Sequence, residues 1–166
     1  MKGLERVIQW HWQETILQHP LPNQHAYTKS RSCETALSTV VERMERGKHL
    51  KEHTLLVSLD CSGAFDNLTY ESAVRALRES GVSETLVKWY HNLLNNRTVD
   101  SELYGLGRTI RPSRGSPQGG VLSPLVWNLA INGLLRQFRE ERVVADLGKQ
   151  CIKAVGYADD VLLLGQ

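Results

Sequence analysis

Three aspartates stand beside apolar runs, where core residues would be expected. Asp60 follows the run LLVSL, and Asp159 and Asp160 lie between VGYA and VLLL. An ionised carboxylate beside buried strands needs a hydrogen-bond donor or a cation, or it becomes protonated. If these strands are neighbours in one sheet, Asp60 and one of the adjacent aspartates hold two divalent cations about 3.5–4 Å apart, which is a phosphoryl-transfer site. Carboxylate oxygens favour Mg²⁺ over zinc at such a site.

The aspartate pair also has a structural explanation. Aspartate is a common turn residue, and a hairpin tip with two aspartates on its own is more often structural than catalytic. The motifs elsewhere in the chain therefore decide between the two interpretations.

The elements that position these residues alternate between helix and strand. Apolar spacing and capping residues predict helices over residues 4–16, 32–47, 69–81, 83–94 and 123–139, a buried strand over 55–59, and hairpins over 98–110 and 152–164. In the second helix Ser32 is the expected N-cap and Gly47 the expected C′ residue, with Leu37, Val40, Val41 and Met44 on its apolar face. With no linker or repeat, one α+β domain is expected.

Composition limits the classes of protein. The 166 residues are 41% hydrophobic and 23% charged, which is typical of a globular chain rather than a disordered one. A formal net charge of +2 does not by itself indicate nucleic-acid binding. Three cysteines without a CxxC pair support neither a disulfide framework nor a zinc ribbon. No apolar stretch approaches the roughly 20 residues of a membrane span, so we expect an intracellular protein.

Four motifs in order resemble those of reverse transcriptases. Residues 157–160 (YADD) are similar to the YxDD signature, and residues 59–67 (LDCSGAFDN) resemble the first palm motif. Residues 114–124 (RGSPQGGVLSP) resemble the motif under the template and the nascent base pair, and residues 24–32 (QHAYTKSRS) resemble the fingers motif that reaches the triphosphate. The resemblance spans essentially the whole chain. The AFDN and PQG-VLSP spellings point toward non-LTR retrotransposons, with group II intron enzymes as close relatives.

The resemblance implies a role for each matching residue. Asp60 and Asp159 are the expected metal ligands, and Asp160 supports the site. The expected nucleotide contacts are Ala64, Phe65, Gln118, Arg31 and Lys29, and the expected template and primer contacts are Gly115, Pro117, Gln118, Gly119 and Tyr157. Gly120 is the third loop glycine expected to let a nucleic-acid strand come close.

Some of these roles have alternatives. Phe65 is expected to exclude a 2′-hydroxyl by bulk, but its position also suits core packing. Gln118 alone would be an exposed loop amide. Thr28 stands where relatives commonly carry an arginine, so Lys29 replaces that cation only in part.

The implied fold is partial fingers (about residues 1–53) plus a palm (about residues 54–166) of a right-hand polymerase, with an antiparallel sheet packed on helices and the thumb absent. The implied activity is RNA-directed DNA synthesis with two Mg²⁺ ions, for which Mn²⁺ can substitute. Its partners would be an RNA template, a DNA primer, dNTPs and further polyprotein segments, including a thumb expected beyond Gln166. The expected site of action is the nucleus.

Two other functions remain open. The chain is a truncated, inactive retroelement remnant with weak nucleic-acid binding, or it is an RNA-templated RNA polymerase with the same palm. Phe65 argues against the RNA polymerase, because an enzyme that accepts ribonucleotides leaves room for the 2′-hydroxyl.

Overall fold

The computed structural model describes residues 2–16, 21, 23–104, 106–140, 144–145, 148–149 and 152–165. The chain divides into two compact units. Unit 1 comprises Met1–Pro20 and Gly63–Leu129, and unit 2 comprises Leu21–Ser62 and Ala130–Gln166. These bounds do not follow the predicted fingers–palm division near residue 53, which stays a prediction.

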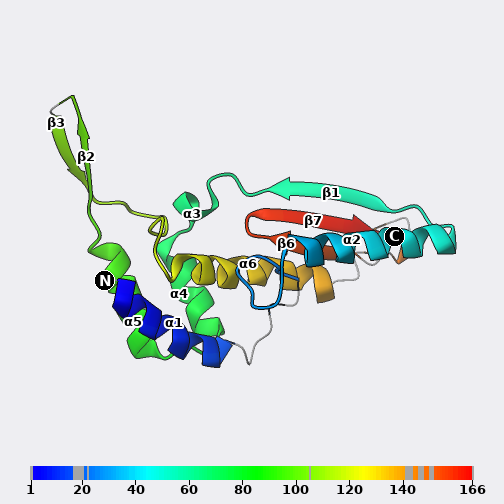
Figure 1. Cartoon of the computed structure of the whole chain (residues 1–166), viewed down its shortest axis with the longest axis horizontal. Coiled ribbons are helices and arrows are strands. Elements are labelled where there is room, and N and C mark those ends of the chain that lie inside the picture. Colours follow the sequence, from blue (N-terminus) through cyan, green and yellow to red (C-terminus); the bar gives the residue numbers. More distant parts are fainter. Residues whose placement is uncertain are drawn as a thin grey trace. The chain divides into compact units, whose positions relative to one another are not determined.

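Helices and strands of both units are labelled in Figure 1. Unit 1 contains α1 (Lys2–Ile16), α3 (Ala64–Asn67), α4 (Tyr70–Glu79), α5 (Glu84–Asn95), β2 (Val99–Leu103) and β3 (Leu106–Ile110). Unit 2 contains α2 (Cys33–Leu50), β1 (Leu55–Asp60), β4 (Val144–Ala145), β5 (Gly148–Lys149), β6 (Ile152–Tyr157) and β7 (Asp160–Gly165). The helix α6 (Ser123–Glu140) begins in unit 1 and ends in unit 2.

A three-stranded antiparallel sheet of order β1-β7-β6 forms the centre of unit 2. Side chains alternate between its two faces. On one face Ala36 of α2 packs with Val155 and Leu164 of the sheet. On the other face Gly156 lies against Leu135 of α6, where an added Cβ would come within 3.1 Å of the leucine side chain. The hairpin β6–β7 is thus covered on both faces, as its apolar sequence predicts.

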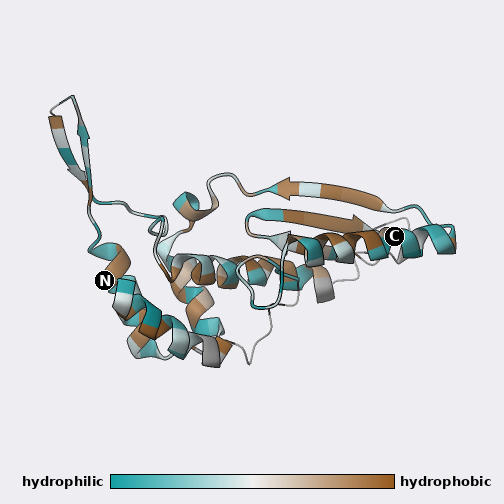
Figure 2. Cartoon of the chain, in the orientation of Figure 1, coloured by the Kyte–Doolittle hydropathy of each residue, from teal (hydrophilic) through white to brown (hydrophobic). Residues whose placement is uncertain are grey.

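Strand β1 departs from the prediction of a buried strand. All six of its residues are exposed, and Leu55 has 65% of its surface accessible. The reason is its place at the sheet edge, beside β7 only. Figure 2 shows that this strand is nevertheless mostly apolar. An apolar run therefore identified the strand correctly but not its burial.

The face of α2 that packs on the sheet agrees with the predicted one only in Val40, which is partly buried against Val155 and Leu164. The other predicted residues, Leu37, Val41 and Met44, are exposed. Ala36, which was not predicted, is buried and packs on the sheet beside Val40.

The start of α2 was predicted correctly and its end was not. Ser32 forms a capping box with Thr35, as its type suggests. The helix continues past Gly47 to Leu50, and Lys51 takes the left-handed C-cap conformation instead (φ 58°). Gly47 is buried within the helix, so its small size suits packing rather than chain reversal.

Helices α1, α4 and α5 form the core of unit 1. The ring of Trp12 meets the ring of Tyr90 edge-on, with centroids 5.9 Å apart. Leu77 of α4 and Val87 of α5 are fully buried in the same unit. Thr69 caps α4 by accepting a hydrogen bond from the Ser72 amide. These three helices confirm the predicted ones to within a few residues.

The remaining predictions hold in outline. The hairpins β2–β3 and β6–β7 and the helix α6 lie where they were expected, while the short α3 and the two-residue strands β4 and β5 were not predicted. Pro20 and Pro22, expected to end the first helix, and Gly105, expected at the first hairpin turn, lie outside the described residues. The mixed α+β class with antiparallel sheets is confirmed. None of the helices in the described part of the chain has the length and apolarity of a membrane span.

Candidate active site

Strand pairing brings the predicted aspartates together at one end of the unit 2 sheet. Asp60 and Asp160 are direct partners in the β1–β7 register. Partners in an antiparallel pair lie about 4.5–5.5 Å apart at Cα and point to the same face. Asp159 precedes this pair in the turn, where its carbonyl accepts a hydrogen bond from the Cys61 amide at 3.2 Å.

The turn that carries Asp159 is held by the side chain of Gln24, which does not belong to the β6–β7 hairpin. The Gln24 Nε2 donates to the Ala158 carbonyl at 3.2 Å, and its Oε1 accepts from the Ala158 amide at 3.1 Å. The same Oε1 accepts from the Ala26 amide at 3.0 Å. Gln24 has no exposed surface. The sequence placed Gln24 in a motif but indicated no role for this residue. Because Gln24 is buried and bonds to the backbone of Ala158, it is a positioning residue for the aspartate turn.

The thiol of Cys61 lies in the field of all three aspartates. Burial raises the pKa of Cys61 above its usual range, and the charges of Asp159, Asp60 and Asp160 raise it further. Cys61 is therefore a neutral thiol at neutral pH.

Like charges placed opposite one another on adjacent strands destabilise a sheet. A cation between them reverses that effect, and carboxylates on an exposed sheet end suit a hard divalent ion. Within the described residues, no three His, Cys, Asp or Glu side chains converge to complete a metal site by themselves. This fits Mg²⁺, which is usually held by one or two carboxylates plus waters and substrate phosphates. Asp60 and Asp160 are exposed and Asp159 is half-buried, so substrate oxygens have access.

In unit 1 the loop 114–122 is fastened to α3 and to Leu68, the residue that follows this helix. The Gly115 amide donates to the Leu68 carbonyl and the Ser116 amide to the Phe65 carbonyl, both at 2.8 Å. Gly115 has φ 89°, and a Cβ there would come within 2.9 Å of the Asp66 carbonyl oxygen. Position 115 is a glycine because the backbone of Asp66 leaves no room for a side chain there.

The other predicted loop residues differ in what they face. A Cβ on Gly120 would come within 2.7 Å of the Ser123 hydroxyl, whereas Gly119 (φ 74°) faces open space. Gln118 is exposed, and its Nε2 donates to the Asp66 carboxylate at 3.4 Å. Pro117 is half-buried and accepts, through its carbonyl, from the Gly120 amide. Of the three glycines in this loop, Gly115, Gly119 and Gly120, only Gly119 leaves space for another molecule.

Glu5 of α1 holds the far end of the same loop. Its carboxylate accepts a hydrogen bond from the Val121 amide at 2.7 Å, across 116 residues of sequence. The sequence carried no sign of this contact, since Glu5 is an ordinary first-turn acid.

Phe65 lies in α3 next to the buried Ala64 and is itself half-buried. Its ring packs on that of Trp127, with centroids 5.7 Å apart and an interplanar angle of 38°. Trp127 is 8% exposed. Nothing in the sequence had indicated Trp127, which packs on one side of the Phe65 ring.

Arg31 and Lys29, the expected triphosphate cations, belong to unit 2. The Arg31 Nη1 donates to the carbonyls of Leu21 at 2.5 Å and Gln24 at 2.7 Å. Lys29 is exposed, and so is Tyr157, which pairs with Asp160 in the β6–β7 register. The structure thus brings Tyr157 into the row of the aspartates.

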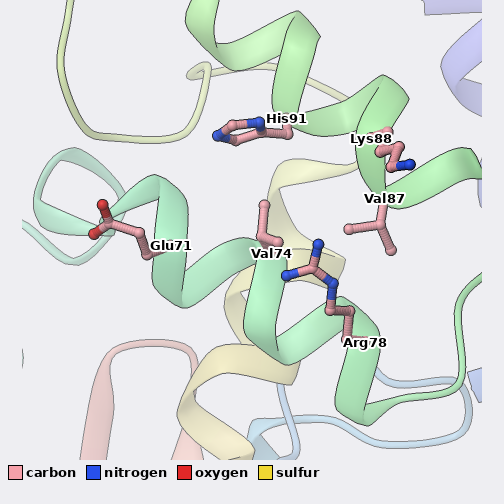
Figure 3. A pocket seen from close by; sticks show the side chains of 6 residues that line it. All are labelled: Glu71, Val74, Arg78, Val87, Lys88 and His91. Carbon is pink, nitrogen blue, oxygen red and sulfur yellow. The ribbon is translucent and has the colours of Figure 1, made fainter. Parts of the chain in front are cut away.

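A separate pocket of about 240 Å³ opens between α4 and α5 in unit 1 (Figure 3). Val74 and Val87 form its apolar part, and the side chains of Glu71, Lys88 and His91 lie around it. Its remaining lining residue, Arg78, forms an ion pair with Glu84 at 2.8 Å. The pocket contains none of the predicted site residues.

The family described as reverse transcriptase (RNA-dependent DNA polymerase) matches residues 1–166. The chain belongs to the reverse transcriptase family. It is 30% identical over 149 residues to the Pol polyprotein of the retrotransposable element R2DM of Drosophila melanogaster, which covers 87% of this chain and 14% of that protein. It is 33% identical over 111 residues to the R2 polyprotein of Nasonia vitripennis, covering 65% of this chain and 10% of that one. The reverse transcriptase chain is thus related to the Pol polyproteins of R2 and R1 non-LTR retrotransposons and spans a small part of their length.

Solved structures agree on the fold of this reverse transcriptase chain. Apo telomerase from Candida tropicalis superposes with a TM-score of 0.70 at 10% sequence identity. The match covers 96% of this chain and 31% of the telomerase.

Proposed function

We propose that the chain is the fingers–palm part of an RNA-directed DNA polymerase that adds dNTPs to a primer 3′-hydroxyl on an RNA template. The observation that carries the proposal is the pairing of Asp60 with Asp160 at the sheet end, with Asp159 beside them. Residues 1–53 would belong to the fingers and residues 54–166 to the palm, and the site of action would be the nucleus.

Asp60, Asp159 and Asp160 would hold Mg²⁺ or Mn²⁺ in this proposal. Bound there, divalent cations lower the pKa of an attacking hydroxyl and neutralise the charge of the departing pyrophosphate. The task of the chain's own carboxylates is to fix the cations at the sheet end. Gln24 keeps the Asp159 turn in place through the backbone of Ala158.

Residues of unit 1 would select the nucleotide. Phe65, with Ala64 next to it, would exclude a 2′-hydroxyl by bulk, and Trp127 supports the Phe65 ring. The loop with Pro117, Gln118 and Gly119 would contact the template and the new base pair. Its two ends are fastened by hydrogen bonds, which preorganises it for this role.

Residues of unit 2 have proposed contacts of their own. Lys29 is the exposed cation for the triphosphate, and Arg31 fixes the loop that carries Lys29 through its bonds to backbone carbonyls. Tyr157 would touch the primer next to the aspartates.

Cation binding to the 166-residue chain gives the first test. In a Mn²⁺ titration followed by electron paramagnetic resonance, Asp60→Asn and Asp159→Asn should weaken binding roughly tenfold or more. Asp100→Asn is the matched control, because it removes one carboxylate from the exposed β2–β3 hairpin of unit 1. Equal affinity in all variants would remove the metal-ligand assignment.

Primer extension gives the second test, on the chain and on the longest open reading frame that contains it. Mg²⁺-dependent dNTP incorporation on a primed RNA template should vanish with Asp159→Asn and persist with Asp100→Asn. Phe65→Val should raise the ratio of rNTP to dNTP incorporation. Cation binding without incorporation in either protein would favour the inactive remnant, and rNTP preference in the wild type would favour the RNA polymerase.

A further inference from the structure

Unit 2 also has a hollow, which lies between the loop 23–31, the first turns of α2 and the strand β6. It has a volume of about 230 Å³. The described residues that line it are Asn23, His25, Arg31, Thr35, Thr39, Lys153, Ala154 and Val155. We call it the basic pocket, because every ionisable side chain among these lining residues is a base.

The walls of the basic pocket are held by backbone pairing and by the core. The His25 amide donates to the Gly156 carbonyl at 2.9 Å, and the Gly156 amide donates to the Asn23 carbonyl at 2.7 Å. The loop is thereby attached along the β6 edge like a further strand. On the other side, Ala36 of α2 packs on Val155 of β6. The lining side chains therefore project from a fixed frame.

Hydrogen bonds hold Arg31 and His25 in place at the wall of the pocket. The Arg31 Nη1 donates to two backbone carbonyls, which are neutral acceptors. The His25 Nδ1 lies 2.8 Å from the Thr35 hydroxyl, which also accepts from the Ser32 amide and lies 2.8 Å from the Ser32 carbonyl. All these contacts are satisfied when His25 Nδ1–H donates to the hydroxyl and the hydroxyl donates to Ser32.

The field inside the pocket is positive. Burial lowers the pKa of His25, and the charges of Arg31 and Lys153 lower it further. Two cations therefore act on one imidazole from two sides of the pocket. An anion is the ligand that such a field favours.

We propose that the basic pocket binds a phosphate group. Ammonium and guanidinium groups make their strongest hydrogen bonds with phosphate oxygens. The volume of the pocket is several times the roughly 30 Å³ that one water molecule occupies in the liquid. The pocket therefore has room for a phosphate group together with the atoms esterified to it. The phosphate is that of a nucleic-acid backbone or of a free nucleotide.

This site is separate from the aspartate cluster. Lys153 lies four residues before Tyr157 on β6, which corresponds to about 13 Å along a strand. One phosphate group therefore does not contact both places. The inference does not rest on polymerase activity, so either proposal survives the failure of the other.

The test uses the 166-residue chain and the variant Lys153→Gln, which removes one cation at a half-buried strand position. Lys88→Gln removes the same charge from α5 in unit 1 and serves as the matched control. Inorganic phosphate is titrated while amide chemical shifts are followed by NMR. Shifts should concentrate at residues 23–39 and 153–155, and Lys153→Gln should weaken binding about fivefold or more while Lys88→Gln changes it less than twofold. Lys153→Arg should restore affinity, which a folding defect would not allow.

A labelled single-stranded RNA 12-mer and AMP distinguish the two sources. For a backbone phosphate, Lys153→Gln should reduce the slope of log affinity against log salt by about 0.7 for the RNA. For a free nucleotide, AMP should produce the same shifts as phosphate while the RNA slope stays unchanged. Phosphate shifts that are scattered over the surface, or unaffected by Lys153→Gln, would overturn the proposal.

Discussion

Two hairpins of this chain each turn at a non-glycine residue with a left-handed backbone, but they differ in the burial of their side chains. The β6–β7 hairpin turns at Ala158 (φ 56°) and the β2–β3 hairpin turns at Tyr104 (φ 52°), so both tips place a non-glycine residue in the left-handed region. In β6–β7, Val155, Val161 and Leu164 are buried. The described side chains of β2 and β3 are all exposed, and Tyr104 is 95% exposed.

The difference indicates what fixes a functional turn. A left-handed L-residue costs roughly 1–2 kcal/mol in either hairpin, so the turn itself does not distinguish them. In β6–β7 the side chain of Gln24 bonds to both backbone groups of Ala158. The aspartate turn is therefore positioned by a residue more than a hundred positions away, whereas Tyr104 is left open to solvent.

The largest expected effect comes from removing Gln24. Gln24→Ala should lower the free energy of unfolding by about 3 kcal/mol, because it removes three hydrogen bonds that a fully buried side chain makes. Tyr104→Ala should change it by less than about 0.5 kcal/mol, as expected for an exposed tip. Urea unfolding followed by circular dichroism measures both.

Hydrogen exchange at the Ala158 amide serves as the local check. Exchange should accelerate in Gln24→Ala and stay unchanged in Tyr104→Ala. If Gln24→Ala proves as harmless as Tyr104→Ala, the turn is held by its strands alone and the contrast between the hairpins fails.

The second effect extends the contrast to two glycines with similar backbone angles in unit 1. Gly115→Ala should cost more than about 2 kcal/mol, because a Cβ would lie 2.9 Å from the Asp66 carbonyl oxygen and φ is 89°. Gly119→Ala should cost about 1 kcal/mol, since φ is 74° but no atom lies near. Thermal unfolding compares the two. Equal losses would mean that backbone angle alone, and not the surroundings, determines the cost.

The aspartate site was predictable in part. The motifs named Asp60, Asp159 and Asp160, and the apolar runs correctly indicated strands. The inference that Asp60 adjoins a buried strand was wrong, because β1 is an exposed edge. The register between β1 and β7 places Asp60 opposite Asp160. Local periodicity does not reveal the order or register of strands that lie a hundred residues apart in the sequence.

The supporting residues were less predictable than the aspartates. Gln24, Glu5 and Trp127 act through contacts that form only when distant segments meet. Helix starts were readable from caps such as Ser32 and Thr69, because a cap bonds within four residues of itself. The end of α2 was not readable, because burial of Gly47 overrode the usual role of glycine at a helix end.

A smaller effect should have opposite signs in the two hairpins. Without divalent cations, Asp160→Asn should stabilise the chain by a few tenths of a kcal/mol, because it removes a like charge opposite Asp60. Asp100→Asn should destabilise it slightly, because it weakens the bond from the Thr109 hydroxyl to the Asp100 carboxylate. Melting temperatures in EDTA and in Mg²⁺ measure this. Mg²⁺ should remove the advantage of Asp160→Asn, and a loss of stability in EDTA would mean that the carboxylates do not repel one another.

An effect of similar size separates the two tips themselves. Tyr104→Gly should stabilise the chain by about 0.5 kcal/mol, because glycine takes a left-handed φ without the Cβ penalty and the tyrosine ring is exposed. Ala158→Gly should be close to neutral, since the same relief is offset by the loss of a buried methyl group worth about 0.8 kcal/mol. Chemical unfolding at closely spaced denaturant concentrations resolves the difference. If Ala158→Gly stabilises as much as Tyr104→Gly, burial of the Ala158 methyl contributes nothing. The aspartate turn would then be held by the Gln24 hydrogen bonds alone.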